Sequence, residues 1–136
     1  MDRIFIDTNI LVYTIDSYNK EKQKKARKLL KELIAKESPV ISTQVLQEFY
    51  NAVTMKLKAD KLTAKSMLHG FSSLDTVQVN LHIIEQAVDI NILSGMSFWD
   101  SLIIAAAEAA NCSILLSEDL ADGQIVRGIE IKNPFK

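Results

Sequence analysis

The chain has 136 residues, and we expect residues 1–136 to form a single domain that buries its own core without a disulfide or a structural metal. Apolar residues make up 48% of it and charged residues 24%, with four glycines and two prolines, which indicates an ordinary globular protein with a lean toward helix and few loops. The formal net charge of −1 neither favours nor excludes nucleic-acid binding, although eight of the 16 basic residues lie between Lys20 and Lys36.

Three features of the sequence indicate the cellular setting. The single cysteine, Cys112, has apolar neighbours and no partner for an internal disulfide, which fits a reducing cytoplasm. Residues 1–6 run directly into a strand pattern, without the apolar region of a signal peptide. No apolar run reaches the length of about 18 residues that a membrane-spanning helix needs. We therefore expect a soluble, cytoplasmic protein that does not cross a membrane.

Short β-rich runs alternate with helical runs along the chain. The first run, Ile4–Ile6, ends at Asp7, and the last, Ile129–Ile131, has the character of an edge strand. Apolar residues at helical spacing indicate the helices, and Gly95 is expected to end one of them. The predicted strands are 4–6, 40–41, 77–79, 113–117 and 129–131, and the predicted helices are 20–36, 42–57, 63–73, 82–93 and 97–110. This alternation predicts an α/β fold with a parallel sheet and helices on both faces.

Four carboxylates from distant parts of the sequence are predicted to meet at one edge of this sheet. Asp7 follows the first strand and Asp119 follows the fourth. Glu48 lies early in the helix after the second strand, and Asp100 lies in the first turn of a later helix. In an open parallel sheet, strand ends and the starts of the following helices gather at the edge where ligands bind. The pattern therefore favours one shared acidic site.

Each acid also has a purely structural explanation. Asp7 could close a strand in an Asx-turn, and Asp119 could be a turn residue. Asp100 could cap its helix, and Glu48 could be a solvated helix residue. Two of the positions argue against this, because the helix of Asp100 is apolar on nearly every side and Glu48 has apolar and aromatic neighbours. We therefore expect that the four acids are not all structural.

The residue types in this group point to a metal ion. Clustered carboxylates repel one another unless a cation lies among them. Oxygen ligands without His or Cys select Mg²⁺ or Mn²⁺ rather than zinc, and His69 and His82 fall in helical segments away from the strand ends. Such a site suits phosphodiester hydrolysis, because the metal lowers the pKa of a bound water and stabilises charge on the phosphate.

Four motifs in order give the sequence a family resemblance. They are Ile6-Asp7-Thr8-Asn9, Gln47-Glu48, Phe98-Trp99-Asp100 and Ser117-Glu118-Asp119. Over essentially the whole chain they resemble the PIN-domain ribonucleases and, more narrowly, the VapC-type toxins of toxin–antitoxin pairs. The resemblance implies a three-layer α/β/α sandwich with a short, mostly parallel central sheet. It also implies endonucleolytic cleavage of RNA with Mg²⁺ or Mn²⁺.

The resemblance assigns roles to individual residues. The metal-binding catalytic roles fall on Asp7, Glu48, Asp100 and Asp119. The polar neighbours expected to orient these acids and the metal-bound waters are Thr8, Asn9 and Ser117. Many relatives carry a further acid two residues after the last of the four, where this chain has Ala121. The nearby Asp122 is therefore either an outer ligand or a loop residue.

Products and partners follow from the same resemblance. In-line attack by a metal-activated water on exposed single-stranded RNA is expected to leave 5′-phosphate and 3′-hydroxyl ends. The implied partners are the RNA substrate, a cognate antitoxin protein and a second copy of the chain in a homodimer. The basic run 20–36 is either a solvated helix face or a contact for the RNA backbone. The candidates for that contact are Lys24, Lys25, Arg27 and Lys28.

Other protein classes fit less well. A haloacid-dehalogenase-type phosphatase also begins with a strand that ends in Asp, but it needs a second Asp where this chain has Asn9. A receiver-type phosphoacceptor domain would have paired acids after the first strand and a Lys after the last. The alternative from another class is a catalytically silent PIN scaffold that binds RNA or a partner protein. Such a scaffold has no reason to keep four repelling charges.

Overall fold

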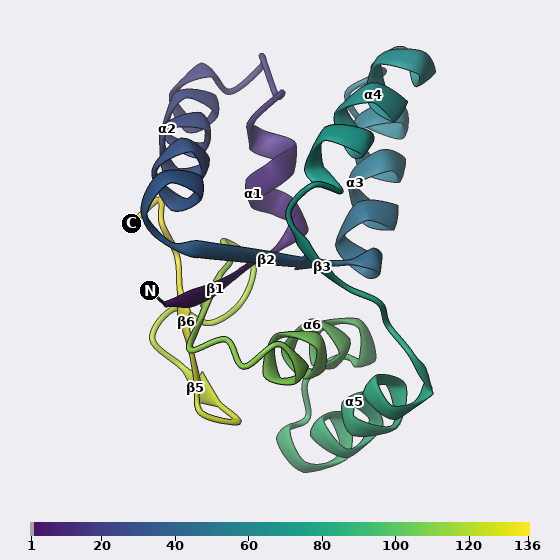
Figure 1. Ribbon diagram of the computed structural model, residues 1–136, viewed down its shortest axis with the longest axis vertical. Helices are drawn as coiled ribbons and strands as arrows, with labels where there is room; N and C mark the ends of the chain where they lie inside the picture. Colours follow the sequence, from purple (N-terminus) through teal and green to yellow (C-terminus); the bar gives the residue numbers. More distant parts are fainter. Residues whose placement is uncertain (1) are drawn as a thin grey trace.

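The computed structural model describes residues 2–136, which form a six-stranded sheet between two layers of helices (Figure 1). The strand order is β3-β2-β1-β4-β6-β5, and every neighbouring pair is parallel except β5 with β6. The strands are β1 Arg3–Ile6, β2 Ser38–Ser42, β3 Asp75–Val77, β4 Ile114–Leu116, β5 Ile125–Val126 and β6 Ile129–Lys132. The predicted α/β fold with a mostly parallel sheet is confirmed.

Helices α1 to α4 lie on one side of the sheet, and α5 and α6 lie on the other (Figure 1). Their bounds are α1 Thr8–Tyr13, α2 Lys20–Lys36, α3 Thr43–Met55, α4 Lys61–Phe71, α5 Leu81–Ser94 and α6 Phe98–Ala109. All of them begin at an Asp, Asn or Ser side chain that accepts a hydrogen bond from a backbone N–H of the first turn. Gly95 ends α5 as predicted, in the left-handed conformation that glycine adopts without strain.

The core lies against both faces of the sheet. Phe5, Ile41 and Leu115 in the strands have no exposed surface, and residues 101–107 of α6 are all buried. The apolar composition of α6 on nearly every side is therefore explained by its central position. Cys112 belongs to the same core, and burial raises the pKa of its thiol to about 11, which makes it unreactive. No helix within residues 2–136 is both long and apolar enough to span a bilayer.

Four elements, β3, β5, β6 and α1, differ from the prediction in ways that the structure explains. β3 runs from Asp75 to Val77 instead of 77–79, because its neighbour β2 ends at Ser42, the partner of Val77, where the chain turns into α3. β6 is not an edge strand, since the unpredicted β5 pairs with its outer side. The six-residue helix α1 is also absent from the prediction, and it follows β1 without a loop because Asp7 caps it directly.

Candidate active site

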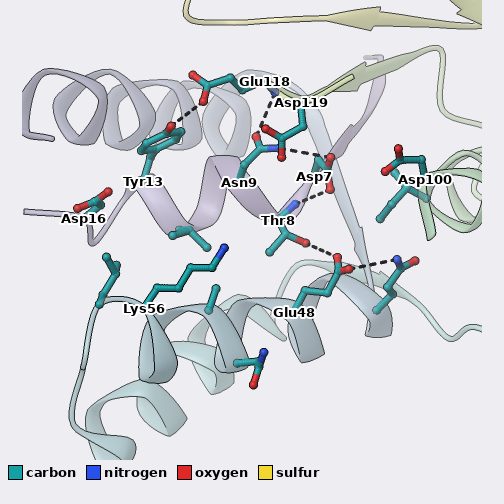
Figure 2. A pocket seen from close by; sticks show the side chains of 16 residues that line it. Asp7, Thr8, Asn9, Tyr13, Asp16, Glu48, Lys56, Asp100, Glu118 and Asp119 are labelled. Carbon is teal, nitrogen blue, oxygen red and sulfur yellow. Dashed lines mark hydrogen bonds between the residues drawn. The ribbon is translucent and has the colours of Figure 1, made fainter. Parts of the chain in front are cut away.

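A pocket of about 520 Å³ opens where β1 and β4 end, at the edge predicted to carry the site (Figure 2). Its lining includes the four predicted acids Asp7, Glu48, Asp100 and Asp119. They come from the end of β1, from α3, from the first turn of α6 and from the loop after β4. The structure therefore brings together four carboxylates that are up to 112 residues apart in sequence (119 minus 7).

Asp7 is the innermost of these acids, with a residue exposure of 7%. Its Oδ1 accepts a hydrogen bond of 2.7 Å from the backbone N–H of Thr8, and its Oδ2 accepts one of 2.8 Å from Ser117 Oγ. The pKa of Asp7 is raised from 3.8 to about 6, mainly by burial and to a smaller extent by the charges of Glu48 and Asp119, against the lowering effect of these hydrogen bonds. In the absence of a cation, Asp7 is therefore poised to take up a proton near neutral pH.

Asn9 and Ser117 connect Asp7 to Asp119. The Asn9 amide donates to Asp119 Oδ2 at 3.1 Å and, more distantly, to Asp7 Oδ2 at 3.4 Å. Ser117 is fully buried, and its Oγ accepts the backbone N–H of Asp119 at 3.2 Å while donating to Asp7. These contacts fix the loop after β4 against the end of β1, so the polar neighbours predicted from sequence do surround the acids.

Glu48 approaches the pocket from α3 and is held from two sides. Its Oε1 accepts the Thr8 hydroxyl at 2.9 Å, and its Oε2 accepts the Gln44 amide at 3.5 Å (Figure 2). The apolar and aromatic neighbours of Glu48 in sequence do not shield it from solvent, because Phe49 turns into the core while Glu48, one position earlier on the helix, stays exposed. A carboxylate at this place can change its conformation to meet a ligand.

Asp100 faces the pocket from the opposite wall, at the start of α6 (Figure 2). Its backbone N–H donates to Ser97 Oγ, so the residue takes part in the helix cap as its sequence spacing suggested. Its half-buried carboxylate has no side-chain partner within residues 2–136. Helix capping therefore accounts for the backbone of Asp100 but not for its charge.

The donor set fits a hard divalent cation by its chemistry. None of the four carboxylates forms an ion pair in the described part of the chain, and their partners are hydroxyl, amide and backbone donors. Within residues 2–136 no three acidic, histidine or cysteine side chains stand close enough to hold one ion between them. The exposed Glu48 and Asp119 would therefore have to turn inward toward Asp7 to share an ion.

Several predicted residues lie away from the pocket. The Asp122 carboxylate accepts the backbone N–H of Asn133 at 2.8 Å and so closes a loop near the C-terminus. Arg27 donates to the carbonyl of Thr14 and lines a separate pocket between α2 and α4. The remaining basic candidates, Lys24, Lys25 and Lys28, are exposed on α2 and do not line the acidic pocket. The two histidines are exposed on α4 and α5.

The sequence interpretation missed several residues that line or support the pocket. Gln44 is 6% exposed and bridges Glu48 and the carbonyl of Trp99, so it ties α3 to α6. It lies four residues before Glu48, a helical spacing that could have placed it on the same face. Tyr13 and Glu118 also line the pocket, and Tyr13 Oη donates to Glu118 at 2.6 Å. Tyr13 was missed because its helix α1 was missed.

The fold and this pocket define a class of protein. The sequence matches the family model described as PIN domain over residues 4–121, and the chain therefore belongs to the PIN-domain family. This is a nuclease family, as the motifs around the four acids implied. A comparison with curated protein sequences finds no match.

The fold is similar to that of VapC toxins in solved structures. DNA-bound VapBC from Salmonella typhimurium is 19% identical, with a TM-score of 0.71 over 98% of this chain and 99% of that one. A toxin–antitoxin complex from Klebsiella pneumoniae is 18% identical, with a TM-score of 0.70 over 96% and 97%. VapC20 of Mycobacterium tuberculosis, a toxin that cleaves the sarcin–ricin loop, is 16% identical, with a TM-score of 0.63 over 82% and 86%. At these identities the similarity establishes the fold alone.

Proposed function

We propose that this protein is a metal-dependent endoribonuclease that hydrolyses RNA phosphodiester bonds. The observation that carries the proposal is the convergence of four carboxylates, from four separate segments, on one pocket without a paired cationic side chain. Such a group is unfavourable in an empty pocket, and Asp7 already has a raised pKa there. Membership of the PIN-domain family supports the same activity.

Asp7, Glu48, Asp100 and Asp119 would hold Mg²⁺ or Mn²⁺, with Asp7 as the central ligand. When bound, the cation lowers the pKa of a water and stabilises the charge that develops on the phosphate. Ser117 and the Thr8 backbone keep the carboxylate of Asp7 in one orientation, so little side-chain freedom is lost when a ligand arrives. Glu48 is exposed and accepts a hydrogen bond from the Thr8 hydroxyl. It would bind a second ion or orient the attacking water.

The RNA substrate of this proposal is single-stranded at the cleavage point, because a recessed pocket is reached by an exposed phosphodiester and not by one inside a helix. Hydrolysis would leave 5′-phosphate and 3′-hydroxyl ends. The exposed Lys24, Lys25 and Lys28 on α2 stay in the proposal as outer contacts for the RNA backbone. Arg27 is retained less strongly, since its side chain already binds the carbonyl of Thr14.

We further propose that the protein acts in the cytoplasm as the toxin of a type II toxin–antitoxin pair. The similar structures from Salmonella typhimurium and Klebsiella pneumoniae are toxin–antitoxin complexes, which supports a small antitoxin as the partner of this chain. The proposed assembly also includes a second copy of the toxin. A short open reading frame that overlaps or adjoins the start of the gene would support the pairing.

Sequencing of RNA ends tests the nuclease proposal directly. Wild-type protein and Asp7→Asn are expressed side by side, and the 5′-phosphate ends of total RNA are mapped. We expect a set of new ends in the wild type that is missing in the variant. Identical end profiles would contradict the nuclease proposal and favour a catalytically silent PIN scaffold that binds RNA or a partner protein.

Thermal unfolding with and without Mn²⁺ tests the metal separately. An ion that binds only the folded state at one hundred times its Kd adds about 2.7 kcal/mol to the free energy of unfolding. We expect Mn²⁺ to raise the Tm of the wild type, and to raise that of Asp7→Asn much less. Equal Tm values with and without Mn²⁺ in the wild type would contradict the metal site.

A further inference from the structure

The acidic pocket continues beyond the four carboxylates, along the groove between α1 and α3 (Figure 2). This second half, here called the α1–α3 subsite, is lined by Val12, Tyr13, Asp16, Asn51, Ala52, Lys56 and Leu57. Its walls differ from the carboxylate end, because apolar side chains alternate with a few polar ones. A mixture of this kind is typical of sites that bind small organic groups.

Lys56 is the single cationic side chain among the residues that line the pocket. Its side chain extends from the end of α3 into the pocket, toward α1 (Figure 2). It lies eight residues after Glu48, which corresponds to about 12 Å along a helix axis. Within residues 2–136 its ammonium group forms no ion pair and no hydrogen bond with another side chain. The charge is therefore free to meet a ligand.

Two structural explanations of Lys56 account for only part of this arrangement. A cation at the C-terminus of α3 is favoured by the helix dipole, but that requires only a position near the last turn and no direction into a pocket. A counter-charge for the nearby acids would be paired with one of them, and neither Asp16 nor Glu48 lies within ion-pair distance of it.

A polyanion needs a fixed positive charge in this pocket, because the other charged groups that line it are acidic. The basic residues of α2 do not supply it. Lys24, Lys25 and Lys28 do not line the pocket, and Lys22, which does not line it either, is bonded to the lining residue Glu118. Lys56 is thus the residue available to bind a phosphate close to the reacting one.

We propose that the α1–α3 subsite binds a nucleotide of single-stranded RNA next to the scissile bond, with Lys56 bonding its phosphate and Val12, Ala52 and Leu57 contacting its sugar or base. The inference rests on the proposed ribonuclease function and names a positioning contact for its substrate. The proposed contact has two testable properties: it is electrostatic, and it is directed at one particular linkage of the RNA.

Kinetics on short RNA substrates test the electrostatic contact of Lys56. A fluorescent single-stranded RNA that contains a mapped cleavage site is cut by wild type, Lys56→Met, Lys56→Arg and the control Lys65→Met, which changes an exposed lysine on α4 outside the pocket. We expect Lys56→Met to raise KM about tenfold, as the loss of one charge-assisted hydrogen bond, and to leave kcat unchanged. Lys56→Arg should restore KM, and Lys65→Met should behave as wild type.

Salt dependence gives a readout that does not need turnover. Fluorescence anisotropy measures the Kd of the same RNA with each lysine variant in an Asp7→Asn background, over a range of salt concentrations. Loss of one phosphate contact should lower the slope of log Kd against log salt by about 0.7. Equal slopes for Lys56→Met and Lys65→Met would overturn the subsite.

A set of RNAs that each carry one uncharged methylphosphonate linkage tests whether Lys56 contacts one particular linkage. At the linkage bound by Lys56, neutralising the phosphate should weaken wild-type binding but leave Lys56→Met unaffected, as in a double-mutant cycle. If both proteins lose equal affinity at every linkage, Lys56 binds no particular phosphate and the subsite is wrong, while RNA cleavage itself stands. If the wild type neither binds nor cuts RNA, it is the proposed function that fails.

Discussion

Asp7 is the buried acid among those that line the pocket, and its environment differs from that of Glu48 and Asp119, which are exposed. The cost of burying its charge appears as a pKa raised to about 6, and the hydrogen bonds from Ser117 and Thr8 offset only part of that cost. A carboxylate whose charge is destabilised by burial gains most when a cation binds. This supports Asp7 as the central ligand of the proposed metal site.

The raised pKa of Asp7 predicts a pH dependence of stability in metal-free protein. Because the folded-state pKa of about 6 lies above the ordinary value of 3.8, the folded state binds more protons than the unfolded state between these values. The free energy of unfolding should therefore fall as the pH rises from about 4 to about 6, by on the order of 3 kcal/mol. Asp7→Asn cannot ionise and should lack this fall. Urea unfolding in the presence of EDTA at a series of pH values measures both proteins.

Asp119→Asn is the matched control for that series, since it removes an exposed acid from the same pocket. It should keep most of the pH dependence of the wild type, slightly reduced because one charge near Asp7 is gone. If Asp7→Asn and the wild type run parallel between pH 4 and pH 6, Asp7 does not have a raised pKa.

At the scale of elements, the helices and strands that pack in the interior could be predicted from their residue pattern. The residue pattern predicts α6 and the strand ends that carry Asp7 and Asp119. It therefore also predicts that the four acids meet. What could not be predicted depended on neighbours in space. The end of β3 is set by the end of β2, and β5 exists only because β6 offers an outer edge. α1 has six residues, too few to display a helical period.

The loop after β4 is held by a cluster of Tyr13, Lys22 and Glu118 that joins it to α1 and α2. Glu118 Oε1 accepts the Tyr13 hydroxyl at 2.6 Å, and Glu118 Oε2 forms an ion pair with Lys22 at 2.5 Å. Burial by itself would raise the pKa of Glu118, but the hydrogen bonds from Lys22 and Tyr13 lower it below its ordinary value of 4.5. The backbone N–H of Glu118 donates to Asn9, so the cluster also steadies the acidic site.

Removal of the Tyr13 hydroxyl should destabilise the protein in a pH-dependent manner. Tyr13→Phe keeps the edge-to-face contact of the ring with Phe135 and loses the bond to Glu118. We expect the free energy of unfolding to fall by about 1 kcal/mol at pH 7, a modest value because the cluster is partly exposed to solvent. A lowered folded-state pKa contributes stability above the unfolded value, so the difference should shrink as the pH falls below 4.5.

Tyr50→Phe provides the comparison for this measurement by urea unfolding. The hydroxyl of Tyr50 makes no hydrogen bond in the described residues 2–136, so its removal should change stability little at any pH. Equal losses in the two variants would mean that the Tyr13–Glu118 bond does not stabilise the loop.

At the scale of the whole molecule, two apolar faces of α5, one buried and one exposed, indicate an interaction surface. One face of this helix packs against α6 through Ile83, Ala87 and Ile90. The opposite face carries a second apolar row, which consists of Leu81, Ile84, Val88 and Ile92 and is exposed. A helix with apolar residues on two faces is expected between two layers of protein, and within the described residues 2–136 only the face toward α6 is covered. The proposed homodimer would supply the second, because a two-fold axis can pair such a row with itself.

Ile92→Lys should weaken this homodimer. Ile92 is 71% exposed, so the substitution costs the isolated chain little, whereas a symmetric interface through α5 receives two lysines at once. We expect the dimer Kd to rise at least about tenfold, which corresponds to about 1.4 kcal/mol, as measured by sedimentation velocity over a range of protein concentrations. Leu62→Lys, which places the same charge at an exposed apolar position on α4, should sediment as the wild type does. A wild-type dimer that Ile92→Lys leaves intact would place the interface elsewhere, and a wild type that stays monomeric at high concentration would contradict the homodimer itself.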